Sequence, residues 1–148
     1  MMNKFFLILI FFLSSCGYQA VYVNKNIENS YFQKINLEGD KFINRRIINT
    51  LPIKESDKNQ NKLFISSSHQ IEQSSKNSKG EVVSFRTIIS VNLEMRNKNS
   101  EIVQSKNFVK EFTYGNKKNK FELVEYQNSI RNDLVNKIIS EIMIFLNS

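Results

Sequence analysis

The sequence predicts an α+β fold: a two-layer sandwich with two helices packed on one face of a mixed four-stranded sheet, in the order β-α-β-β-β-α. Apolar and polar residues alternate over 83–95, which is typical of a long strand with one solvated face and favours antiparallel neighbours. Segments 40–51 and 123–145 repeat apolar residues every three or four positions, as amphipathic helices do. Because the first helix lies between two strand-like segments, those strands are expected to be parallel, with a right-handed crossover.

The amino terminus has the features of a lipoprotein export signal. Lys4 precedes nine consecutive apolar residues at 5–13. A membrane-spanning helix needs about 20 apolar residues, so residues 1–15 are expected to be a cleaved signal peptide. The stretch "LSSC" ending at Cys16 resembles the lipobox of bacterial lipoproteins. That resemblance implies covalent diacylglyceryl and N-acyl chains on Cys16, palmitate among them. The alternative is an ordinary secretory signal with an incidental cysteine.

The composition suits one domain behind this anchor. The chain has 148 residues, 41% of them hydrophobic and 24% charged, so residues 16–30 are expected to be a tether and residues 31–148 a single α+β domain. One cysteine and one histidine exclude an intrachain disulfide and a zinc site built from Cys and His ligands. A net charge of +7 points to an anionic partner: nucleic acid, a membrane surface or an anionic lipid.

The first half of the domain is predicted from local signals. Residues 31–37 are expected to form a short strand. Asp40 can cap the following helix by accepting backbone N–H bonds, and Pro52 ends it. A polar loop at 54–62 then leads to a second strand at 63–75. The inward faces are predicted to carry Ile43, Ile47, Leu51, Leu63, Ile65 and Ile71.

The second half begins with the long strand at 83–95, followed by a turn, a partner strand at 101–114 and the terminal helix at 123–145. In the partner strand, Lys106 and Lys110 share the parity of the aromatic residues, which leaves its register open. The residues predicted to face inward are Val83, Phe85, Thr87, Ile89, Val91, Leu93, Met95, Phe108, Phe112, Tyr114, Leu123, Tyr126, Ile130, Leu134, Ile138, Ile142 and Phe145.

No sequence pattern is typical of a catalytic or metal site. Gly-rich phosphate loops, an HExxH pattern and dense carboxylate pairs are absent. His69, the only histidine, shares the inward parity of Leu63 and Ile65 and is expected to be a hydrogen-bonded structural side chain. We therefore expect no enzyme, no catalytic residues, no bound metal and no cofactor beyond the lipid on Cys16.

Lysines near the predicted loops are candidates for binding an anionic lipid, because ammonium groups bind phosphate as point charges. The simpler alternative is that they are only solvated in a lysine-rich chain. Nucleic acid is not expected, since the aromatic residues follow strand and helix periods and an exported lipoprotein would not meet it. The predicted topology places at one end of the sheet Lys76, Lys79, Lys117, Lys118 and Lys120, together with the helix start near Lys41.

The chain resembles the LptE family of lipopolysaccharide-assembly lipoproteins. The local similarity is the start "CGYQAVY" at Cys16, and the wider similarity is a strand, the helix "DKFINRRIINTL", three strands and a long terminal helix. The resemblance implies an outer-membrane lipoprotein on the periplasmic face that plugs the LptD β-barrel. It further implies roles in barrel assembly and in delivery of lipopolysaccharide to the outer leaflet.

Two other functions stay open at this stage. One is a lipid-binding lipoprotein accessory to a lipid-trafficking transporter, which should have an apolar pocket between sheet and helices. The other is a structural lipoprotein. The polar outward residues of the strands, with Arg86, Asn92 and Arg96, suit the plug, because the lumen of an outer-membrane barrel is polar.

Overall fold

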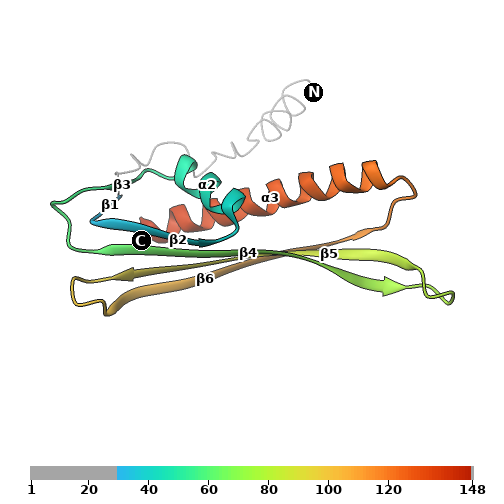
Figure 1. Ribbon diagram of the computed structural model, residues 1–148, viewed down its shortest axis with the longest axis horizontal. Coiled ribbons are helices and arrows are strands. Elements are labelled where there is room, and N and C mark those ends of the chain that lie inside the picture. The colour runs from blue at the N-terminus through green and yellow to red at the C-terminus, as the bar shows by residue number, and fades with distance from the viewer. Residues whose placement is uncertain (1–29, 148) are drawn as a thin grey trace, which may run out of the picture.

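The computed structural model describes residues 30–147, and these form the predicted two-layer α+β sandwich (Figure 1). The elements are β1 (Ser30–Phe32), β2 (Lys34–Gly39), α2 (Lys41–Thr50), β3 (Ile53–Glu55), β4 (Lys62–Lys76), β5 (Val82–Arg96), β6 (Ile102–Gly115) and α3 (Lys120–Leu146). A mixed sheet has the order β2-β4-β5-β6. Strand β2 is parallel to β4, whereas β4, β5 and β6 are antiparallel to one another. Both helices cover one face of this sheet (Figure 1).

The prediction of one strand over 31–37 and a loop over 54–62 was wrong in detail. The segment contains two strands, β1 and β2, because the strand is interrupted at Gln33, whose backbone N–H donates to the carbonyl of Asn61 (2.7 Å). Strand β1 pairs in parallel with β3, outside the main sheet. Three-residue strands are too short to show a period of two in sequence. They form here because Phe32 and Ile53 are buried in the core.

The core lies between the sheet and the helices, mainly where both helices cover the strands. Helix α2 packs over β2 and β4, and α3 packs over β5 and β6. The register confirms the predicted inward parity, and it places Lys106 and Lys110 of β6 on the helix side, opposite Leu93 and Ile89. Fully buried side chains include Ile43, Ile47, Leu63, Ile65, Ile89, Val91, Leu93, Ile138 and Ile142.

Three strand residues predicted to be buried are instead exposed, as is Tyr126 of α3 (37%). Ile71, Val83 and Phe112 have the correct parity but are 42%, 42% and 45% exposed. All three lie beyond the point where β2 ends beside Ser67 and α2 begins. Past that point α3 is the one described helix that covers the helix side of the sheet, so the correct parity is not sufficient for burial.

The junction from β2 into α2 depends on Gly39. This residue has φ +89°, a conformation that side chains with a Cβ rarely adopt. A Cβ at Gly39 would also overlap the carbonyl oxygen of Ser67 on the neighbouring strand β4. The backbone of β4 therefore requires glycine at the point where the chain leaves the sheet.

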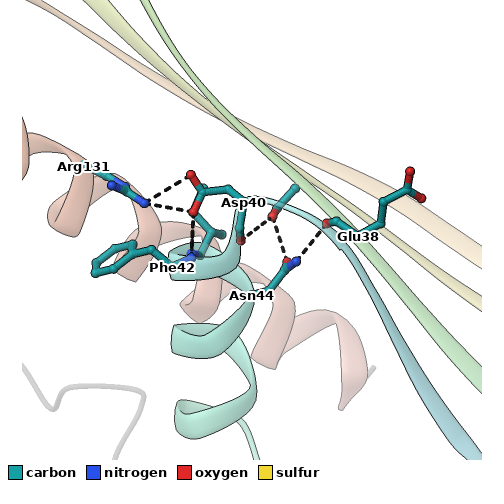
Figure 2. A network of polar contacts seen from close by, with 7 residues as sticks. Glu38, Asp40, Phe42, Asn44 and Arg131 are labelled. Atoms are coloured by element: carbon teal, nitrogen blue, oxygen red, sulfur yellow. Dashed lines mark hydrogen bonds and ion pairs between the residues drawn. The ribbon is translucent and has the colours of Figure 1, made fainter.

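Asp40 then fixes the start of α2, as predicted, and also joins the two helices (Figure 2). Its Oδ1 accepts from the backbone N–H groups of Phe42 (2.9 Å) and Ile43 (3.0 Å), as an N-cap does. Arg131 of α3 donates to both carboxylate oxygens, at 2.9 and 3.2 Å. The Arg131 guanidinium also lies 4.0 Å from the ring centroid of Phe42.

A second set of polar contacts in Figure 2 ties α2 to the sheet. The amide of Asn44 donates to the carbonyl of Glu38 (2.8 Å) and accepts from the hydroxyl of Ser67 (2.8 Å). The backbone N–H of Asp40 donates to the carbonyl of Ser67 (3.1 Å). These bonds satisfy polar groups that are buried between the layers, which stabilises a single docking position for α2.

The expectation of a hydrogen-bonded histidine at position 69 was wrong. His69 lies on the helix side of β4, opposite Ile89, and its Nε2 is buried with no hydrogen-bond partner among the described residues. Burial lowers the pKa of His69, the positive charge of Arg131 lowers it further, and Asp40 opposes the change. The folded protein therefore favours the neutral imidazole.

Candidate functional site

Five of the lysines predicted to form a site lie at one end of the sheet, here called the basic end: Lys76, Lys79, Lys117, Lys118 and Lys120. Lys76 is the last residue of β4 and pairs with Val82, the first residue of β5, and Lys79 lies in the turn between these two strands. The loop between β6 and α3 lies beside this turn, because Asn116 donates from its backbone and its side-chain amide to the carbonyls of Val83 and Val82, each at 2.8 Å. Figure 1 shows both connections at the same end of the elongated molecule.

The prediction that Lys41 belongs to this end was wrong. Lys41 starts α2 two residues after Gly39, which pairs with Ser67 in the middle of β4. Strand β4 continues for nine more residues to Lys76, or about 30 Å of extended chain. The prediction assumed that β2 and β4 end at the same edge of the sheet, whereas β4 is much longer than β2 and extends past its end.

Apolar side chains are exposed at the same end, and sequence reasoning did not find them because it assigned them to the core or left them unassigned. Phe121 and Val124 in the first turns of α3 are 72% and 52% exposed. The ammonium of Lys117 lies 4.9 Å from the ring centroid of Tyr126, which packs edge-to-face on Tyr114 (5.7 Å between centroids). The basic end thus combines cations with apolar surface.

Among residues 30–147 no helix covers the opposite face of the sheet, which is lined mainly by polar side chains together with Phe64, Ile88 and Val109; we call it the open face. Arg86 of β5 forms ion pairs across both neighbouring strands, with Glu72 of β4 (3.2 Å) and Glu111 of β6 (3.9 Å). These pairs are substantially exposed, so each contributes little to stability. Their main effect is to hold long charged side chains across the middle strands.

A second polar group lies further along β5 on the open face. Glu94 accepts from Arg96 (2.6 and 3.2 Å) and from the amide of Asn92 (3.0 Å). The hydrogen bond from Arg96, and then that from Asn92, lowers the pKa of Glu94 below its usual value. The Arg96 guanidinium also lies 4.3 Å from the ring centroid of Phe64 on β4. Each of these side chains is therefore held by its neighbour.

Between these two charged groups the open face is hollowed. Two adjoining hollows, of about 430 and 310 Å³, both include Glu38, Ser66 and Asn92. The second hollow extends to Ser68, Ser90 and Asn107, across β4, β5 and β6. Short polar side chains on adjacent strands form this depression, and no local sequence motif marks them.

The predicted lipidation site, Cys16, lies outside the described residues, as do the predicted signal peptide and nearly all of the tether. Among residues 30–147, no group of three or more His, Cys, Asp or Glu side chains is placed to hold a metal ion. No helix in that part of the chain is both long and apolar enough to cross a membrane.

Comparison with known proteins identifies the fold. Neither a protein family nor a curated protein matches the chain by sequence. Among solved structures, an uncharacterized lipoprotein B from Nitrosomonas europaea matches with a TM-score of 0.54 and 10% identity, over 84% of this chain and 88% of that one. A putative lipoprotein from Caulobacter crescentus matches with a TM-score of 0.53 and 13% identity, over 78% and 86%.

A third solved structure, a putative neuraminyllactose-binding hemagglutinin homolog from Helicobacter pylori, matches with a TM-score of 0.51 and 11% identity, over 85% of this chain and 87% of that one. The fold is one found in bacterial lipoproteins. At these identities the likeness concerns the fold alone.

Proposed function

We propose that this protein is a lipid-anchored outer-membrane lipoprotein of the LptE type, seated on the periplasmic side as a plug in the LptD barrel. In this role it assists assembly of the barrel and delivery of lipopolysaccharide to the outer leaflet. The observation that carries the proposal is the open face, a four-stranded and mainly polar surface that α2 and α3 leave uncovered because both pack on the other side.

The open face has the chemistry that a barrel lumen requires. The interior of outer-membrane barrels is polar, so a plug must offer hydrogen-bonding groups rather than apolar surface. Arg86 and Arg96 are each held by carboxylates on this face, and Asn92 lies between them along β5. Preorganised side chains lose little conformational entropy on docking, which favours a stable complex.

The basic end has the chemistry that an anionic glycolipid requires. Ammonium groups at Lys117, Lys118 and Lys120 can bind lipid phosphates, while Phe121 and Val124 next to them offer exposed apolar surface to acyl chains. Lysines also occur at the opposite end of the sheet, but the combination with exposed residues of α3 distinguishes the basic end. We therefore assign contact with lipopolysaccharide to this end.

The alternative function is lipid binding on behalf of a transporter, without a barrel. The exposed Phe121 and Val124 favour it, because they could contact a lipid directly. It calls for an apolar pocket between sheet and helices. The two hollows described above lie instead on the open face, and most of the residues that line them are of polar type. This location favours the plug.

The decisive experiment is affinity purification of the full-length lipidated protein from native outer membranes in a gentle detergent, with mass spectrometry of every polypeptide that co-purifies. The plug requires a large β-barrel in near-equal amount. An inner-membrane transporter in its place supports the alternative function, and recovery of the lipoprotein alone contradicts both functions.

The matched control for this purification is Cys16→Ala. If Cys16 carries the lipid anchor, this variant loses labelling by radioactive palmitate and no longer fractionates with the outer membrane. Normal labelling and fractionation of Cys16→Ala would contradict the lipoprotein assignment itself, independently of which partner is recovered.

A further inference from the structure

We propose that the hollow on the open face is a binding site for an uncharged saccharide chain. The site comprises Glu38 of β2, Ser66 and Ser68 of β4, Ser90 and Asn92 of β5, and Asn107 of β6. The proposal deepens the proposed function, on which it rests for the source of the saccharide, namely the sugar portion of a glycolipid.

The register explains why the face is hollow at this place. Glu38, Ser66, Asn92 and Asn107 are opposite one another on four successive strands. In the next row, about 7 Å further along the strands, Ser68 lies opposite Ser90, which in turn lies opposite Val109 of β6 at the margin of the hollow. Two adjacent rows of mostly short side chains therefore form a trough that crosses the strands.

Longer side chains flank the trough on both sides. On one side Phe64 lies opposite Glu94, and Arg96 packs over the Phe64 ring. On the other side, beyond Gln70 opposite Ile88, come Glu72 and Arg86. The hollows together are of the size of sites that hold small ligands, about 300 to 1,000 Å³. An open trough between raised rims suits a chain molecule that lies across the strands.

The side chains that line the trough determine which kind of ligand it can bind. Serine hydroxyls and asparagine amides each donate and accept hydrogen bonds, as sugar hydroxyl groups do. Of the side chains among residues 30–147 that line the two hollows, Arg96 is the only cation, and Glu94 already holds it, while Glu38 adds a further negative charge. An anionic group is therefore repelled, and a neutral polyhydroxyl chain is accepted.

Side chains of the first hollow are already held in place without a ligand. Phe64 lines it, with the Arg96 guanidinium 4.3 Å from its ring centroid. Asn92 is held by Glu94, so its amide is already positioned without a ligand. This site is separate from the basic end, which we assign to the binding of lipid phosphates by cations and of acyl chains by exposed apolar residues.

The test is an NMR titration of the full-length lipidated protein in detergent with two lipid-free probes. One is maltoheptaose, an uncharged hexose chain, and the other is the core oligosaccharide released from lipopolysaccharide by mild acid, dephosphorylated and with its carboxyl groups reduced to alcohols so that it too is uncharged. We expect at least one probe to cause saturable shifts in the backbone amides of Ser66, Ser68, Ser90 and Asn92, with a dissociation constant on the order of 1 mM. Because no ionic contact is involved, raising the salt concentration should leave the affinity unchanged.

Two variants fill the trough, and one matched variant does not. Ser90→Tyr and Ser68→Tyr place a bulky side chain on the floor and should each weaken binding at least tenfold. Thr113→Tyr introduces the same side chain on the open face, in the row of Arg86 and outside the hollow, and should bind as the unmodified protein does. Amide spectra of all three variants establish that they are folded.

Absence of shifts at these positions with both probes would overturn the proposal. So would a response confined to the basic end, or equal weakening by Thr113→Tyr. Barrel co-purification of the unmodified protein separates this inference from the proposed function, because the tyrosine variants also alter the open face that the plug would present to the barrel. Recovery of the barrel without any saccharide binding would leave the plug intact and remove the saccharide site.

Discussion

Asp40 performs two structural roles that substitution can separate. As the N-cap of α2 it accepts from Phe42 and Ile43, and as an ion-pair partner it binds Arg131 of α3. Asparagine caps helices about as well as aspartate does, so Asp40→Asn removes the charge and keeps the cap, whereas Asp40→Ala removes both. The two variants therefore measure the ion pair and the cap independently.

The magnitudes follow from burial. The side chains of Arg131 and Asp40 are 20% and 22% exposed, between the exposed pairs that contribute up to about 1 kcal/mol and the buried pairs whose disruption costs about 3 to 5 kcal/mol. We expect Asp40→Asn to reduce the free energy of unfolding by about 1 to 2 kcal/mol. Loss of a cap costs about 1 kcal/mol more, so Asp40→Ala should cost about 2 to 3 kcal/mol.

Urea denaturation followed by circular dichroism measures these differences. Arg131→Gln and the double variant with Asp40→Asn complete a cycle whose coupling free energy should be about 1 to 2 kcal/mol. A coupling near zero would refute the ion pair as a link between the helices. Equal costs for Asp40→Asn and Asp40→Ala would refute the cap.

The same pair predicts a dependence on pH. Burial raises the pKa of Asp40, but hydrogen bonds from Ile43 and Phe42 and the charge of Arg131 outweigh it, so the pKa is lowered from its usual 3.8. A carboxyl group with a lowered folded pKa stabilises the fold above its unfolded pKa. That stability is lost as the pH falls below 3.8 towards the folded value. Asp40→Asn should not show this loss.

Gly39→Ala should lower the free energy of unfolding by about 2 to 4 kcal/mol, because alanine disfavours the positive φ and its Cβ would overlap the backbone of β4. Gly80→Ala, at φ +82° with open space around it, should lower it by only about 1 kcal/mol, and equal urea midpoints for the two variants would contradict this. Because the pKa of His69 is lower in the folded protein than in the unfolded chain, the free energy of unfolding should fall as the pH drops below 6.5. The stability of His69→Gln should change less between pH 7.5 and 5.5 than that of the unmodified protein, and identical pH profiles for the two proteins would argue against this reasoning. Replacing the three lysines of residues 117–120 with glutamine should weaken binding to anionic-lipid vesicles on the order of 100-fold at low salt, at about 1 kcal/mol per lysine, and flatten its salt dependence. A matched variant with the same change in net charge at the opposite end, and with little expected effect, replaces Lys54, Lys58 and Lys98.

Local pattern was sufficient for the type, order and inner face of the main elements. The alternation over 83–95 places its apolar side chains on the helix side of β5, and Asp40 and Pro52 bracket α2. These features depend on residues close together in the chain, so a period or a cap is visible in sequence. The order of the elements was also enough to bring the lysines of the β4–β5 turn and the β6–α3 loop to one end.

Only the tertiary structure decided how much of each face is buried and where the polar contacts form. Ile65 and Ile71 have the same parity on β4, but one is in the core and the other is exposed, because α2 begins beside Ser67. Arg131 reaches Asp40 from 91 residues away. The trough on the open face likewise requires polar side chains from four strands to fall in register. Burial and register depend on which distant segments pack together, and the hydrophobic periodicity of one segment does not indicate which other segments pack against it.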